Sequence, residues 1–207
     1  MIRTGFFGGS FNPVHTGHIA LAHQLLRLAS LDEIWFVVSP LNPFKLHADD
    51  LLADDKRLLL TQTALAGDKR LVACDYEFRL PKPSYTWDTL RHLSHDYPDR
   101  IFTLLIGADN WLAFDRWYHG ADIVAHYPIV VYPRRGFTVD PATLTDGVRL
   151  VDTPLYDISS TQIRHRLAEG ESVEGLVPDS ILPLVTRYYA PHAPLAAPKT
   201  NTISTKT

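Results

Sequence analysis

The sequence predicts an α/β protein built on a doubly wound parallel sheet. Its strand-like segments are apolar along their whole length, and segments with helical periodicity separate them. Strands without polar alternation are typical of a parallel sheet that helices cover on both faces. A composition of 45% hydrophobic and 21% charged residues over 207 positions is ordinary for a globular protein.

Each expected element is marked by its apolar pattern or by a capping signal. Continuous apolar runs predict buried strands, and apolar residues three and four positions apart predict one buried helix face. Asp54 or Asp55 and Thr86 are candidate helix caps, and Gly107 stops a strand. The expected order is a strand at 2–7, a helix at 18–29, strands at 33–39 and 71–78 with a helix at 54–65 between them, a helix at 86–97, strands at 101–106 and 129–132, and helices at 158–167 and 179–189.

Charge and cysteine content exclude several classes of protein. Twenty basic residues against 23 acidic ones give a net charge of −3, so bulk positive charge does not hold nucleic acid here. The lone Cys74 cannot form an internal disulfide or a multi-cysteine zinc site. No stretch approaches the roughly 20 apolar residues of a membrane helix, so we expect a cytoplasmic protein without a membrane partner.

The chain is expected to form one domain over residues 1–190, followed by a flexible tail over 191–207 that is too poor in apolar residues to pack. In doubly wound sheets, ligands bind beyond the carboxyl ends of the strands. The loops after Phe7, Val38, Phe78, Ile106 and Tyr132 are therefore the places to search for a site.

The first of these loops is specialised for an anion. Gly8 and Gly9 let the backbone turn sharply and leave room for a ligand. The following helix directs free N–H groups and the positive end of its dipole toward the same place, which favours phosphate. His15 and His18, three residues apart, can donate hydrogen bonds to phosphate oxygens and stabilise charge that develops during transfer. The pair does not form a metal site, because no third ligand lies nearby.

A second anion-binding element lies near the other end of the chain. Ser159 and Gln162 have the spacing of a capping box, which predicts a helix N-terminus. Arg164 lies little more than one turn inside that helix, where its guanidinium can bind an anion bidentately.

These two segments resemble motifs of the nucleotidyltransferase superfamily. The first has the pattern Gly-Gly-x-Phe-Asn-Pro-x-His-x-Gly-His, although many relatives carry Asp where this chain has Asn12, and the second is similar to the element that binds the triphosphate of the incoming nucleotide. The resemblance implies a phosphate-contacting lysine at Lys45, whereas Arg57 is interpreted as an exposed helical arginine. The ATP-binding residues that it implies are Gly8, Gly9, Ser10, Phe11, His15, His18, Asp109, Arg134, Ile158, Ser159, Thr161 and Arg164.

Segments in the middle of the chain resemble the bacterial nicotinate-nucleotide adenylyltransferase family. They are Pro-Ser-Tyr-Thr at 83–86, Ile-Gly-x-Asp at 106–109 and Trp-Tyr at 117–118. A pyridine ring could stack on Trp117, which is worth about 1 kcal/mol beyond area burial. The carboxylate on this pyridine ring would accept hydrogen bonds from the backbone N–H groups of Thr86 and Tyr118. The resemblance implies that nicotinate mononucleotide contacts Ser10, Lys45, Tyr85, Thr86, Trp117 and Tyr118.

The implied reaction is attack by the 5′-phosphate of nicotinate mononucleotide on the α-phosphorus of ATP. No protein nucleophile is needed, because a phosphate monoester with a second pKa of about 6 is already largely dianionic at neutral pH. Catalysis would rest on charge stabilisation by His15, His18, Lys45 and Arg164. Mg²⁺ would arrive with ATP, and we expect no dedicated metal site.

Three other functions fit the sequence less well. An adenylyltransferase or cytidylyltransferase for another acceptor, such as nicotinamide mononucleotide or phosphopantetheine, is disfavoured by the segments at 83–89 and 107–118. A nucleotide sensor without activity is disfavoured by the intact histidine pair. A dinucleotide-dependent oxidoreductase would need G-x-G-x-x-G after the first strand, which this chain does not supply.

Overall fold

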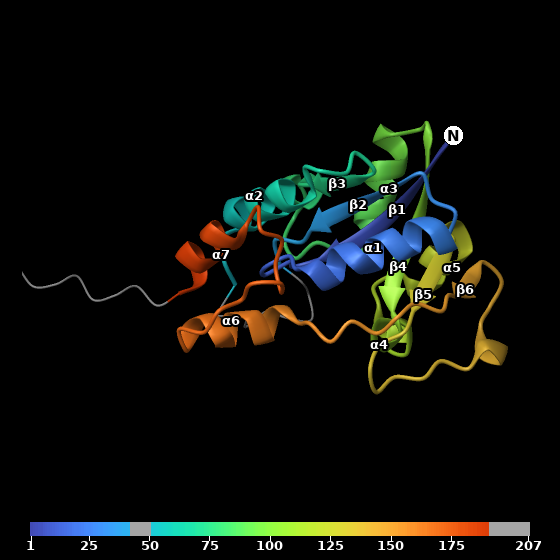
Figure 1. Ribbon diagram of the computed structural model, residues 1–207. Coiled ribbons are helices and arrows are strands. Elements are labelled where there is room, and N and C mark those ends of the chain that lie inside the picture. Colours follow the sequence, from blue (N-terminus) through green and yellow to red (C-terminus); the bar gives the residue numbers. More distant parts are fainter. Residues whose placement is uncertain (42–50, 191–207) are drawn as a thin grey trace, which may run out of the picture.

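The computed structural model describes residues 1–41 and 51–190. They form a six-stranded sheet in the order β3-β2-β1-β4-β5-β6, in which all neighbouring strands are parallel (Figure 1). The strands are β1 (Ile2–Gly9), β2 (Glu33–Val38), β3 (Leu71–Cys74), β4 (Arg100–Gly107), β5 (Ile129–Tyr132) and β6 (Val148–Leu150). The predicted doubly wound parallel sheet is confirmed. The strand order reverses between β1 and β4, and ligands bind at such a switch point beyond the carboxyl ends of the strands.

Helices cover both faces of the sheet. They are α1 (Thr16–Leu28), α2 (Asp54–Leu65), α3 (Thr86–Asp96), α4 (Ala108–Trp111), α5 (Gly120–His126), α6 (Ser160–Ala168) and α7 (Leu182–Tyr189). Figure 1 shows α7 between α2 and α6, beyond the end of β2.

Alternate residues of each strand enter different cores, because successive side chains of a strand point to opposite faces. Phe7 of β1 packs in one core with side chains of α1, α2, α6 and α7, whereas Phe6 packs in the other with side chains of α3 and α5. Continuous apolar strands therefore bury both faces, as the sequence pattern predicts.

Several expectations about the elements were wrong. The strand expected at 71–78 ends at Cys74, and Tyr76–Arg79 form a 3₁₀ helix that turns Glu77 into the interior. Thr86 is the first residue of α3 rather than its cap, which is Tyr85. Asp54 and Asp55 likewise lie in the first turn of α2, whose cap is Ala53. The sheet also has the short sixth strand β6, which pairs with β5 and carries too few apolar residues to be recognised.

No helix within residues 1–41 and 51–190 is long and apolar enough to cross a membrane. The segment at 191–207, expected to be a tail, lies outside the described residues, so the domain boundary at residue 190 remains a prediction.

Candidate active site

Three adjoining cavities lie at the carboxyl ends of the strands. The histidine cavity, of about 390 Å³, lies between His15 and His18 on one side and Arg134 on the other. The central cavity, of about 380 Å³, is lined by the loop after β1 and by Arg164. The aromatic cavity, of about 390 Å³, is lined by residues that include Trp117. Tyr132, the last residue of β5, lines all three, so the cavities adjoin one another, and together they are called the cleft.

The cleft gathers every described residue that the sequence analysis assigned to a site. His15, His18, Asp109, Arg134, Ile158 and Ser159 line both the histidine and the central cavity. Ser10, Phe11, Thr161 and Arg164 line the central cavity, and Gly8 and Gly9 line the central and aromatic cavities. Tyr85, Thr86, Trp117 and Tyr118 line the aromatic cavity. Lys45 lies outside the described residues.

The loop after β1 turns sharply through Phe11, whose φ of 42° is in the left-handed region that few residues other than glycine adopt. This turn buries the Phe11 ring against Phe7 and Phe36 and sets its edge against His18, 5.2 Å between ring centroids. A Cβ on Gly9 would lie 3.0 Å from the Phe11 ring, so a side chain at that position would crowd the turn.

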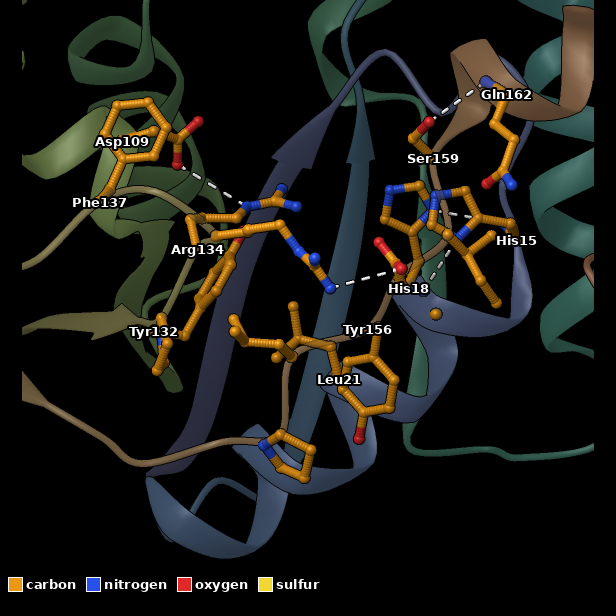
Figure 2. A pocket seen from close by; sticks show the side chains of 17 residues that line it. His15, His18, Leu21, Asp109, Tyr132, Arg134, Phe137, Tyr156, Ser159 and Gln162 are labelled. Atoms are coloured by element: carbon orange, nitrogen blue, oxygen red, sulfur yellow. Dashed lines mark hydrogen bonds and ion pairs between the residues drawn. The ribbon is translucent and has the colours of Figure 1, made fainter.

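His15 and His18 cap α1 and also line the cleft. Each imidazole Nδ1 accepts a hydrogen bond from the backbone N–H of the other residue, at 3.3 Å in both directions. The two rings stack with centroids 3.6 Å apart (Figure 2). Because both Nδ1 atoms accept, the hydrogen of each neutral imidazole lies on Nε2. The capping hydrogen bonds thus prepare two neutral N–H donors at the N-terminus of α1.

Burial keeps both histidines uncharged. It lowers the pKa of His15 to about 3, and the Arg134 guanidinium contributes in the same direction. Burial, His15 and Arg134 together lower the pKa of His18 well below its usual range. At neutral pH the pair can therefore donate hydrogen bonds to an anion without itself carrying a charge.

We predict that His15 stays neutral with its hydrogen on Nε2 down to about pH 5, since its pKa lies far below the unfolded value of about 6.5. Long-range ¹H–¹⁵N spectra of histidine-labelled protein measure both properties. The same protein unfolded in urea is the control and should titrate near pH 6.5. The unfolded state binds more protons below that pH, so this group also lowers the free energy of unfolding as the pH falls from about 6.5 toward 3. A folded-state midpoint near 6.5 would contradict the prediction.

Arg134 and Asp109 form the wall opposite the histidines (Figure 2). The Arg134 Nε lies 3.7 Å from Asp109 Oδ1 and its guanidinium lies 5.4 Å from the centre of the Tyr132 ring. Asp109 Oδ1 is buried and has no hydrogen-bond partner among the described residues. An unsatisfied buried acceptor is costly, so its placement in this wall favours a ligand that donates a hydrogen bond, such as a sugar hydroxyl.

The N-terminus of α6 closes the central cavity. The Ser159 hydroxyl accepts from the backbone N–H of Gln162 at 3.1 Å, which confirms the predicted cap. Arg164 Nη1 donates to the carbonyl of Asn12 at 2.8 Å, and the Ser160 hydroxyl donates to the carbonyl of Pro13, also at 2.8 Å. The two motifs at opposite ends of the chain thus touch each other directly.

The C-terminal helix also reaches this loop. The Tyr189 hydroxyl, at the end of α7, donates to Asn12 Oδ1 at 2.7 Å. The same oxygen accepts from the backbone N–H of Leu52 at 3.1 Å, and Asn12 is buried. An amide oxygen can accept both hydrogen bonds, as a carboxylate would, so Asn12 fulfils this structural role without a charge.

The aromatic cavity opens at the N-terminus of α3, where Tyr85 and Thr86 line it. Tyr85 is the cap residue of α3. Among the described residues, its side chain makes no hydrogen bond to the first turn of this helix. The Trp117 ring packs against Phe114 with centroids 4.9 Å apart, and Tyr118 lies against Tyr85 at 4.7 Å. A flat, partly polar ligand suits this combination of aromatic faces and backbone donors.

Arg57 is not the exposed helical arginine that its position suggested. Its side chain is fully buried, and its guanidinium donates to the carbonyls of Ser10, Ser39 and Leu52. Sequence reasoning also missed Tyr132, Asn110 and Glu77 in the cleft lining. Tyr132 ends an apolar strand whose following loop is one of the expected ligand-binding loops, whereas Asn110 and Glu77 are not part of a recognisable local pattern.

Comparisons with known proteins agree with this architecture. A family model described as cytidylyltransferase-like matches residues 6–166. A protein of Bacteroides fragilis, named probable nicotinate-nucleotide adenylyltransferase, is 51% identical over 171 residues, which cover 83% of this chain and 85% of that protein. A protein of Bacteroides thetaiotaomicron with the same name is 46% identical over 187 residues, or 90% and 92% of the two chains.

Solved structures show the same fold. Nicotinic acid mononucleotide adenylyltransferase of Plasmodium falciparum, complexed with NaAD, matches with a TM-score of 0.74 at 20% identity. The match covers 91% of this chain and 94% of that one.

Proposed function

The chain belongs to the cytidylyltransferase-like family, and from this membership we propose that it transfers the adenylyl group of ATP to nicotinate mononucleotide. The products are nicotinate adenine dinucleotide and pyrophosphate. The observation that carries the proposal is the cleft, in which the central cavity, with its anion-binding groups, adjoins the aromatic cavity at Gly8 and Gly9. The names of the relatives that are 46–51% identical support the same reaction.

The nicotinate ring belongs in the aromatic cavity. Trp117 offers a flat face, and the backbone N–H of Thr86 at the start of α3 offers a donor for the ring carboxylate. The positive end of the helix dipole favours this carboxylate over the neutral amide of nicotinamide mononucleotide. Ser10, in the neighbouring central cavity, lies on the side where the 5′-phosphate would point.

ATP belongs in the histidine and central cavities. Arg164 and the N-terminus of α6 suit the triphosphate, and Asp109 with its unsatisfied oxygen suits the ribose. Lys45 is assigned to the phosphates through the family resemblance alone.

The reaction needs no covalent enzyme intermediate. An oxygen of the 5′-phosphate forms a bond to the α-phosphorus, and the bond from that phosphorus to the bridging oxygen of the β-phosphate breaks, so pyrophosphate leaves. His15 and His18 would donate Nε2 hydrogens to the α-phosphate oxygens as negative charge builds up there. Because the attacking phosphate is already an anion, no general base is required.

A divalent cation completes this chemistry, and we propose Mg²⁺. Within residues 1–41 and 51–190, no group of three or more His, Cys, Asp or Glu side chains is placed to hold a metal. The ion would arrive with the nucleotide, because Mg²⁺ is commonly held through substrate phosphates and water, and it would neutralise phosphate charge.

The test is pyrophosphate release from ATP and Mg²⁺ with nicotinate mononucleotide, nicotinamide mononucleotide or phosphopantetheine in parallel, with products identified by mass. We expect nicotinate mononucleotide to be used far better than the other two. If another acceptor were preferred, the phosphate sites would stand but the roles of Thr86, Trp117 and Tyr118 would be wrong. If ATP bound but no acceptor reacted, the protein would be a nucleotide sensor.

A further inference from the structure

His119, the cap residue of α5, has a backbone conformation that histidine rarely adopts. Its φ of 54° and ψ of 36° lie in the left-handed region. The conformation belongs to a turn at 117–120, in which the backbone N–H of Gly120 donates to the carbonyl of Trp117 at 3.0 Å. Glycine or asparagine is usual at the third position of a turn where φ is positive. Strained residues persist where their surroundings hold them, and they concentrate at binding sites. The contacts of the His119 side chain therefore indicate what this turn is for.

The imidazole of His119 is held by three neighbours. It stacks on the indole of Trp87, in the first turn of α3, with ring centroids 5.7 Å apart and planes 22° apart. Its Nδ1 donates to the Asp122 carboxylate of α5, which fixes the orientation of the ring. The ring of Tyr118 meets it edge-on, with centroids 4.3 Å apart. His119 thus connects the turn to α3 as well as to its own helix.

Two ring contacts join the turn to the start of α3. Tyr118 lies against Tyr85, with centroids 4.7 Å apart, and His119 lies against Trp87. Tyr85 and Trp87 are the residues on either side of Thr86 in the sequence. We call these four side chains, of Tyr85, Trp87, Tyr118 and His119, the four-ring cluster. The cluster fixes the turn relative to the backbone of Thr86.

The backbone N–H groups of Thr86 and Tyr118 are the two donors that the family resemblance assigns to the carboxylate of the pyridine ring. Both residues line the aromatic cavity. A carboxylate can accept from two donors at once. An amide offers one oxygen and one NH₂ group, so one of the two N–H groups would face another donor and lose its hydrogen bond. Selection of the acid therefore depends on both N–H groups being held in place.

We propose that His119 is a positioning residue that makes the aromatic cavity select a carboxylate over an amide. It acts by holding the Tyr118 N–H at a fixed place beside Thr86, through the four-ring cluster. This inference rests on the proposed function and adds to it the residue that supports the choice of mononucleotide. If the turn could shift, the Tyr118 N–H would move away from the NH₂ group of an amide, which would lower the penalty for the wrong acceptor. The same shift would weaken one hydrogen bond to the right acceptor.

The test is His119→Gly, because glycine adopts a positive φ readily and keeps the turn while the ring is lost. The measured quantity is the ratio of kcat/KM for nicotinate mononucleotide to that for nicotinamide mononucleotide. We expect this ratio to fall about fivefold, the effect of weakening one hydrogen bond, with a rise in KM for nicotinate mononucleotide. The KM for ATP should change less than about twofold, since among the described residues His119 lines neither the histidine nor the central cavity.

A second variant separates the ring contacts from the flexibility that glycine adds. In His119→Asn, the new side chain tolerates a positive φ and can donate to Asp122, but it has no ring. Its ratio should fall as in His119→Gly.

His126→Ala is the matched control. The His126 ring also lies against Trp87, with centroids 5.6 Å apart, but it belongs to the end of α5 rather than to the turn. This variant should keep the wild-type ratio.

A ratio in either His119 variant that equals the wild-type ratio would overturn the inference, whatever the change in Tm, because a merely structural role lowers Tm without altering the choice between acid and amide. An equal fall in the ratio of His126→Ala would also overturn it. A wild-type protein that does not prefer nicotinate mononucleotide would instead refute the proposed function, so the two failures are distinguishable.

Discussion

Replacing His18 by alanine is expected to lower kcat about 100-fold or more while ATP still binds. In the proposed mechanism, the Nε2 hydrogen of His18 binds an oxygen whose charge grows only as the α-phosphate is attacked, so its loss would destabilise the transition state more than the ground state. Steady-state kinetics of pyrophosphate release give kcat, and calorimetry gives the Kd of ATP.

The design must separate this loss from the loss of a helix cap, because His18 Nδ1 also accepts from the backbone N–H of His15. His18→Asn keeps an acceptor near that position but has no Nε2 donor, so it should show the same fall in kcat with a smaller change in Tm. His23→Ala is the matched control on the same helix, since His23 is exposed. Near wild-type turnover of either His18 variant would rule out a catalytic role for His18.

The second large effect is expected at Trp117. Trp117→Ala should raise the KM for nicotinate mononucleotide about tenfold or more. The variant loses both the burial of the pyridine ring against the indole and the stacking itself, which is worth about 1 kcal/mol beyond that burial. The KM for ATP should change less than about twofold, since Trp117 lines the aromatic cavity and neither of the other two. Initial rates measured with one substrate varied at a time give both constants.

Trp117 also packs on Phe114, so a structural role must be tested separately. Trp117→Phe keeps an aromatic face toward the cavity and should show a much smaller rise in KM for the mononucleotide. Equal rises in both KM values for Trp117→Ala would show that the residue supports the fold rather than the ring.

Local patterns predicted the sheet and the anion-binding motifs, because a continuous apolar run or a capping signal depends on neighbours in the sequence. The end of β3 at Cys74 was not predictable in this way. Tyr76 and Phe78 continue an apolar alternation that suits a strand, and only the distant hydroxyls of Ser84 and Thr89 explain why the chain turns at Glu77.

For the same reason, the sequence predicted only part of the candidate site. His15, His18 and Arg164 lie in compact motifs at helix N-termini. Arg57 follows three charged residues and precedes three leucines, and its burial follows from the carbonyls of Ser10 and Ser39, 47 and 18 positions away. The residues next to Arg57 in the sequence do not indicate these distant partners.

The hydrogen bond between Tyr189 and Asn12 has a consequence for how the protein is made, since the two residues are 177 positions apart. A ribosome working at about 5–20 residues per second takes about 9–35 s to travel that distance. During nearly all of this interval, the nascent chain contains the whole loop after β1. It lacks the Tyr189 hydroxyl that holds Asn12 in place. The loop after β1 therefore gains this hydrogen bond only after α7 has been synthesised.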